Sequence, residues 1–209
     1  MKDIPFFATE LGAASLTLRE IPFQKKAYIK FQSTQCPAEF LQECAAFCRM
    51  AGAEQIFASG HTYLEQLPFH TAVVQMQCVR EHIRDTDAAL FPVQENTLAD
   101  FTRIYNEKVL HIPNAAWLSA SEAQDMQDGY FVHRDGKLLG VGRAGGDHIA
   151  FVASLCPGAG QDVVAALAHA ITADVVTLEV ATANEKAMAL YTRMGFVPIR
   201  EVSRWYAVK

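Results

Sequence analysis

A short segment near the C-terminus constrains the fold of this chain more than any other part of its sequence. Residues 175–181 form an apolar, largely β-branched run, which predicts a buried strand. Asn184 suits the N-cap of a helix, and Gly195 ends that helix just before the apolar residue Phe196. Tyr191 falls on the same helix face as Asn184. The segment therefore predicts a strand followed by a helix whose end returns to the sheet.

The part of the chain upstream of this segment predicts a similar order of elements. Residues 149–155 form a near-continuous apolar run, which is typical of a central strand. A turn of small residues follows over Cys156–Gly160, and a helix is expected over about 161–171. The two runs on either side of Asp135-Gly136 predict a hairpin, because Asp-Gly is a strong turn signal. This alternation indicates an α/β (α+β) fold.

The pattern N-x-x-A-x-x-L-Y-x-x-x-G-F, from Asn184 to Phe196, resembles the B motif of the GNAT superfamily of acetyl-CoA-dependent N-acetyltransferases. The strand–turn–helix before it stands where that family holds the diphosphate of coenzyme A with backbone N–H groups at a helix start. Residues 90–209 as a whole carry the order of elements of this family. The resemblance implies a GNAT fold, with a mixed central sheet and flanking helices.

The predicted diphosphate turn departs from the family pattern. It is about one residue short, and Ala159 or Gly160 stands where the family has Arg or Gln. Asp162 places an acid near the expected diphosphate, which weakens binding unless the side chain points away or caps the helix. The backbone N–H groups remain, so two interpretations stay open: a turn that binds coenzyme A, or a plain strand–turn–helix crossover.

The resemblance implies a set of site residues. The central strand binds the amides of acetyl-CoA through its backbone, and the turn with the helix start holds the diphosphate. Asn184 caps the second helix or bonds a ligand amide, and Tyr191 contacts the cofactor and is the general acid for the leaving sulfur. The strand residues are Val152, Ala153 and Leu155, and the turn residues are Gly158, Ala159, Gly160, Gln161, Asp162 and Val163.

The general base is less constrained by the sequence. Glu179 interrupts the apolar run 175–181, so it is either a functional acid at the cleft or a solvated residue. His148 is a second candidate, and a chain of water molecules is a third. Cys156 has no base placed beside it by the sequence, which argues against a covalent acetyl-cysteine.

The implied reaction is the direct transfer of an acetyl group from acetyl-CoA to a primary amine of a small molecule or peptide. Trp117, Tyr105 and Phe131 are candidates for the acceptor pocket, although each is also a plausible core residue. The alternative is a catalytically inactive GNAT-like module that binds an acyl-CoA or a protein partner. The sequence predicts no metal site, and it fits either a monomer or a homodimer.

The first part of the chain contains a faint copy of the second at an offset of 120 residues. Chance in an Ala-rich sequence is the alternative to a true repeat. The identical residues are Ile29, Phe31, Cys36, Pro37, Ala45, Ala46 and Ala53, which recur as Ile149, Phe151, Cys156, Pro157, Ala165, Ala166 and Ala173. We therefore expect two domains: a degenerate, structural GNAT-like unit over 1–86 and an acetyltransferase domain over 87–209. The first turn, 36–40, has no glycine and carries an acid, so it should not bind coenzyme A.

The remaining elements follow from periodicity and from turn residues. Strands are expected over 28–32, 55–59, 71–79 and 90–94, helices over 38–51, 98–109 and 114–126, and a final hairpin of strands over 196–202 and 203–208.

Composition excludes several classes of protein. The net charge is −5 and the pI is near 5.8, with no basic run, so a nucleic-acid partner is not expected. No apolar run approaches the roughly 20 residues that a membrane span needs, and the N-terminus does not resemble a secretory signal. The five cysteines lack a CxxC pair, which favours free thiols and a cytoplasmic protein. Cys44 and Cys48 are interpreted as buried residues on one helix face.

Overall fold

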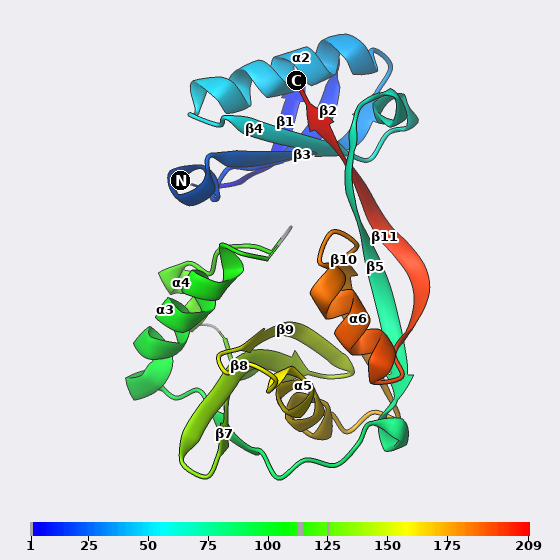
Figure 1. The fold of residues 1–209 in the computed structure, drawn as a ribbon. Coiled ribbons are helices and arrows are strands. Elements are labelled where there is room, and N and C mark those ends of the chain that lie inside the picture. The colour runs from blue at the N-terminus through cyan, green and yellow to red at the C-terminus, as the bar shows by residue number, and fades with distance from the viewer. Residues whose placement is uncertain (1, 113–114, 125) are drawn as a thin grey trace. The chain divides into compact units, whose positions relative to one another are not determined.

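The computed structural model describes residues 2–112, 115–124 and 126–209, and it divides the chain into two compact units (Figure 1). Unit 1 comprises Met1–Val73 together with Glu201–Lys209, and unit 2 comprises Val74–Arg200. The units do not coincide with the predicted boundary between residues 86 and 87. The difference arises because two long strands each begin in one unit and end in the other.

Unit 1 has strand order β1-β2-β3-β4-β11, with β1, β2 and β3 antiparallel and β3 parallel to β4. The helix α2 packs its buried face on this sheet through Phe40, Leu41, Cys44, Ala45 and Cys48. The last residues of the chain complete the unit, because Tyr206 pairs with Ala58 of β4. The elements are β1 (Ile4–Thr9), β2 (Gly12–Thr17), α1 (Ile21–Gln24), β3 (Lys26–Thr34), α2 (Pro37–Met50), β4 (Gln55–Ser59), η1 (Thr62–Gln66), the start of β5 (Phe69–Val79) and the end of β11 (Val197–Val208).

Unit 2 has strand order β5-β10-β9-β8-β7-β6, with β9 parallel to β10 and the strands from β6 to β9 antiparallel. The helices α5 and α6 share one apolar cluster with the sheet, while α3 and α4 share another with Phe151 and Ala153. The elements are η2 (Arg80–His82), β6 (Ala89–Pro92), η3 (Glu95–Thr97), α3 (Leu98–Val109), α4 (Ala120–Gln124), β7 (Gly129–Arg134), β8 (Lys137–Gly145), β9 (His148–Ser154), α5 (Gly160–His169), β10 (Val175–Ala181) and α6 (Glu185–Arg193).

The predicted repeat is present as a repeated topology. In unit 1 an antiparallel pair β2–β3 leads through α2 to β4, which lies parallel to β3. In unit 2 the pair β8–β9 leads through α5 to β10, which lies parallel to β9. The two turns differ, because α2 begins at Pro37, directly after Cys36, whereas α5 begins at Gly160, three residues beyond the equivalent Pro157. Only unit 2 therefore has an open turn before its helix.

Local chemistry explains the elements around the candidate site. Asp135 and Gly136 both have positive φ, 52° and 75°, as the predicted two-residue hairpin turn requires. The side chain of Asn184 accepts a hydrogen bond from the N–H of Ala187, and Gly195 adopts a φ of 91° just after α6. The predicted caps of this helix are thus confirmed.

Two predictions about elements are wrong. The expected final hairpin is one continuous strand, β11. Residues 199–206 contain no Gly, Asn or Asp that would turn the chain near Val202 and Ser203. The expected helix over 114–126 is helical only in α4, and Asn114 lies outside the described residues. No helix in the described part of the chain is both long and apolar enough to cross a membrane.

Candidate functional site

The central strands of unit 2 separate after a short stretch of pairing. In the described residues β9 and β10 pair at Thr177–His148 and Leu178–Ile149, although β10 is seven residues long. The equivalent strands of unit 1 pair from Lys26–Gln55 to Lys30–Ser59, which is the whole of β4. The same pair of strands is therefore closed in unit 1 and open in unit 2.

The wall of this gap is formed by alternate residues of β9. The N–H of Leu155 donates to the carbonyl of Leu139 at 2.8 Å, and the register places Val152 opposite Gly142. Hydrogen-bonded and non-bonded pairs alternate in an antiparallel ladder, so Val152 and Ser154 turn their backbone groups away from β8 and towards β10. Of the predicted strand residues, Val152 faces the gap, whereas Ala153 and Leu155 bond β8. Ser154 was not predicted, and the period of two from Val152 would have identified it.

The turn before α5 presents some of the predicted amides and not others. The N–H of Ala159 bonds Cys156 at 3.2 Å, and the N–H of Val163 bonds Ala159 at 3.0 Å. Both residues are also buried, so they are not placed as donors to a ligand. The N–H groups of the other four predicted residues have no backbone partner within the described chain, and three of them form the first turn of the helix. These four residues are Gly158, Gly160, Gln161 and Asp162.

The side chain of Asp162 does not face the open turn. Its carboxylate accepts hydrogen bonds from Arg84 at 2.5 Å and from Arg134 at 3.2 Å. The carboxylate of Asp162 is thus paired with two arginines beside the helix start. Neither arginine was identified from the sequence, because they lie 78 and 28 residues away along the chain.

Tyr191 lies on the α5–α6 side of the gap. It is 8% exposed and belongs to the apolar cluster that contains Leu178, Val180 and Ala159, against which Val152 packs. Burial raises the pKa of its phenol to about 12. Its hydroxyl makes no side-chain hydrogen bond to any residue that the structure describes. The phenol is therefore a protonated donor beside the strands that form the gap.

Glu179 lies on the opposite face of β10. Its neighbours Leu178 and Val180 are buried against α5 and α6, while Glu179 itself is exposed. Thr177 shares the face of Glu179, and its Oγ1 lies 3.0 Å from Nδ1 of His148. The two predicted candidates for the base, Glu179 and His148, are thus brought to one face of the paired ends of β9 and β10.

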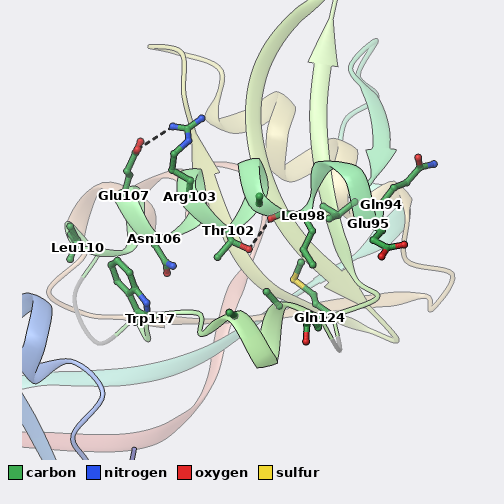
Figure 2. A pocket seen from close by; sticks show the side chains of 15 residues that line it. Gln94, Glu95, Leu98, Thr102, Arg103, Asn106, Glu107, Leu110, Trp117 and Gln124 are labelled. Carbon is green, nitrogen blue, oxygen red and sulfur yellow. Dashed lines mark hydrogen bonds and ion pairs between the residues drawn. The ribbon is translucent and has the colours of Figure 1, made fainter. Parts of the chain in front are cut away.

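A separate groove of about 990 Å³ runs between α3 and α4 (Figure 2). Its apolar lining includes Leu98, Trp117 and Met126, and an Arg103–Glu107 ion pair lies at its edge. The amide of Asn106 bonds both backbone groups of Leu118, which fixes the segment that carries Trp117. Of the predicted acceptor residues, only Trp117 lines this groove. Tyr105 packs in the core of the same region, and Phe131 lines a second pocket of about 550 Å³ together with Ile104 and His133. Its lining includes no described residue of β9, β10 or α6.

Comparisons with known proteins place this arrangement of strands and helices. No protein-family model matches the chain, and no curated protein matches its sequence. A GCN5-related N-acetyltransferase from Sphaerobacter thermophilus is 13% identical with a TM-score of 0.57, over 94% of this chain and 76% of its own. A GNAT-family acetyltransferase from Colwellia psychrerythraea is 11% identical with a TM-score of 0.54, over 98% and 84%. A tandem GNAT protein from the clavulanic acid biosynthesis pathway is 9% identical with a TM-score of 0.57, over 95% and 78%.

This chain has the GNAT fold. The predicted fold class is confirmed, and the similarity to a tandem GNAT protein agrees with the repeated topology of the two units. Within the GNAT fold, the open pair β9–β10 and the turn before α5 occupy the positions that the sequence resemblance assigned to the cofactor. The closed pair β3–β4 occupies the same positions in the first copy.

Proposed function

We propose that this protein transfers an acetyl group from acetyl-CoA to a primary amine. The observation that carries the proposal is the gap between β9 and β10, along which the backbone groups of Val152 and Ser154 have no strand partner among the described residues. The amides of the pantetheine arm are the complementary groups, because they continue a β-ladder in place of a strand. The free N–H groups at the start of α5, the helix that follows β9, suit the diphosphate.

The proposed reaction needs an ordered approach of two reactants. The lone pair of the neutral amine attacks the thioester carbon, the C–S bond breaks, and the acetyl group remains on nitrogen. The nitrogen loses one proton to a base, and the sulfur leaves as a thiolate. Holding the amine and thioester in line supplies much of the rate enhancement.

Tyr191 is the proposed donor to the leaving sulfur. With a pKa of about 12 it keeps its proton at neutral pH, as this role requires. A thiol with an ordinary pKa of about 8.5 is the stronger acid. Tyr191 therefore stabilises the developing thiolate by a hydrogen bond, while solvent supplies the net proton.

The proposed base lies on the other face of the sheet. Glu179 is exposed beside the gap, and its carboxylate accepts the proton that the amine nitrogen loses in the reaction. His148, whose Nδ1 lies 3.0 Å from Oγ1 of its paired residue Thr177, is the second candidate for the same step.

The experiment combines calorimetry with a product assay. Acetyl-CoA is titrated into the full chain, and the release of free thiol is then followed with a panel of primary amines, with mass spectrometry to identify the N-acetyl product. We expect binding, and thiol release that requires both an amine and the protein. The absence of binding at millimolar acetyl-CoA would refute the proposal.

The turn before α5 favours a second candidate function. Ala159 or Gly160 stands where the family has Arg or Gln, so the turn lacks the usual cationic or amide side chain. A catalytically inactive module that binds an acyl-CoA is the function that this feature supports. Tight binding of acetyl-CoA with no thiol release across the amine panel would favour this alternative.

A further inference from the structure

Four charged side chains from distant parts of unit 2 meet beside the first turn of α5. Arg84 contacts Oδ1 of Asp162 at 2.5 Å, and Arg134, at the end of β7, contacts Oδ2 at 3.2 Å. Arg134 also lies 3.4 Å from Asp87, and the hydroxyl of Thr86 lies 3.4 Å from Asp162. Asp162 has a side-chain exposure of 13%, whereas Arg84 is 53% exposed, so the carboxylate is the enclosed member of the cluster.

The position of Asp162 makes this cluster relevant to the proposed cofactor. Asp162 is the third residue of α5, and its own N–H is one of the free donors at the helix start. An unneutralised carboxylate at this point opposes the binding of a diphosphate, because it cancels part of the positive field of the helix N-terminus. The first turn of α5, which is proposed to bind the diphosphate, therefore carries a negatively charged side chain.

The contacts of the first turn show where that side chain is held. A Cβ atom built on Gly160 would lie 3.1 Å from Leu190 of α6, so Gly160 faces α6. Two residues further along a helix with 3.6 residues per turn, Asp162 lies on the opposite side, towards β7 and residues 84–87. The two arginines thus meet the carboxylate on the side of α5 that faces away from α6.

We propose that Arg84 and Arg134 are positioning residues that neutralise Asp162 and keep it away from the diphosphate of an acyl-CoA. The inference rests on the proposed function, since it assigns these residues to the cofactor site of that reaction. They act through Asp162 and do not themselves contact the phosphates. Because their positive charge neutralises Asp162, the N-terminus of α5 retains its affinity for an anion although it carries an acidic residue.

The test is a mutant cycle in which calorimetry measures the Kd for acetyl-CoA at low and at high salt. The variants are Arg84→Gln with Arg134→Gln, Asp162→Asn, and all three changes together. We expect the two arginine changes to raise the Kd by about tenfold or more, an effect that shrinks at high salt. Asp162→Asn should bind at least as tightly as the natural protein, and the triple variant should resemble Asp162→Asn. Arg103→Gln is the matched control, because Arg103 pairs with two carboxylates on α3, away from α5.

Three results would overturn the inference and identify the reason. An equal loss from the arginine changes in the Asp162→Asn background would mean that the arginines bind phosphate directly. A loss from Asp162→Asn as large as that from the arginine changes would mean that the cluster only anchors the helix. Unchanged affinity in all variants would remove any role in binding, while the proposed function would stand. Failure of the natural protein itself to bind acetyl-CoA would instead refute the proposed function, and the inference with it.

Discussion

At the scale of single residues, Tyr191 links the chemistry most closely to the structure. Its ring packs on Phe196 with centroids 5.9 Å apart, and the residue belongs to the apolar cluster that contains Leu178 and Val180 of β10. Sequence alone identified this residue from its place before Gly195 and Phe196. The burial of the ring, and the high pKa that follows from it, required the packing of α6 on the sheet.

Replacement of the Tyr191 hydroxyl should separate turnover from binding. Tyr191→Phe keeps the ring that packs on Phe196 but removes the donor to the leaving sulfur. We expect turnover to fall by about 10²-fold or more, while the Kd for acetyl-CoA changes by less than about threefold. Steady-state kinetics and calorimetry on the same preparation measure both. Equal losses in the two quantities would show that Tyr191 has a structural role instead.

The raised pKa of Tyr191 also predicts a dependence of stability on pH. The phenol ionises near pH 10 in the unfolded chain and near 12 in the folded one, so folding favours the neutral form. This contribution, about 3 kcal/mol, is fully present below pH 10 and is lost as the pH rises through 12. Tyr28, whose pKa burial also raises to about 12, adds to the same decline.

The measurement is the free energy of unfolding in denaturant from pH 8 to 11.5. Tyr191→Phe should show a shallower decline above pH 10 than the natural protein, because it lacks the Tyr191 contribution while those of Tyr28 and of the buried thiols of Cys44 and Cys48 remain. An identical decline in both proteins would contradict the assignment of a buried phenol to Tyr191.

At the scale of elements, β8 and α5 are in close contact beside the candidate site. Gly140 lies where a Cβ atom would come within 2.5 Å of the carbonyl oxygen of Ala153 and 2.7 Å of a methyl group of Val163. The neighbours are a strand backbone and a β-branched side chain on a helix, and neither yields readily. The absence of a side chain at Gly140 therefore sets how closely α5 approaches the sheet.

Gly140→Ala should accordingly destabilise unit 2. We expect a loss of about 1–3 kcal/mol in the free energy of unfolding, as for other overpacked cores. Gly145→Ala on the same strand is the control, because its Cβ would meet only a side-chain atom of Asp128 at 3.5 Å. Chemical denaturation measures both variants, and equal stability would argue against tight packing at Gly140.

The elements that sequence missed are those that depend on their neighbours. β1 contains Pro5 and does not alternate, and β2 is built from small residues, so neither has an intrinsic strand signal. They form because β1 pairs with β2, and β2 pairs with β3 along six positions. By contrast, β10 is an apolar run, and α6 has strong end signals at Asn184 and Gly195. The prediction of both elements is confirmed.

At the scale of the whole molecule, the two copies of one supersecondary unit differ in how far their parallel strands pair. In unit 1, β3 and β4 pair along all of β4, and α2 begins directly at Pro37. In unit 2, β9 and β10 separate, and three residues, Pro157 to Ala159, precede α5. Sequence indicated the repeat and the lack of a glycine turn in the first copy. It could not indicate the extent of strand pairing, which depends on contacts between residues far apart in the chain.

This difference between the copies allows the chain to serve as its own control. If acetyl-CoA enters the β9–β10 gap as an additional strand, it covers backbone groups that lack a partner in the free protein. The same ligand should leave the paired strands β3 and β4 unchanged.

Amide hydrogen exchange with and without saturating acetyl-CoA tests this claim most directly. We expect slower exchange at Val152, Ser154 and the first turn of α5, Gly160 to Asp162, with no change along β3 and β4. Protection confined to the α3–α4 groove, or equal protection of both strand pairs, would contradict it.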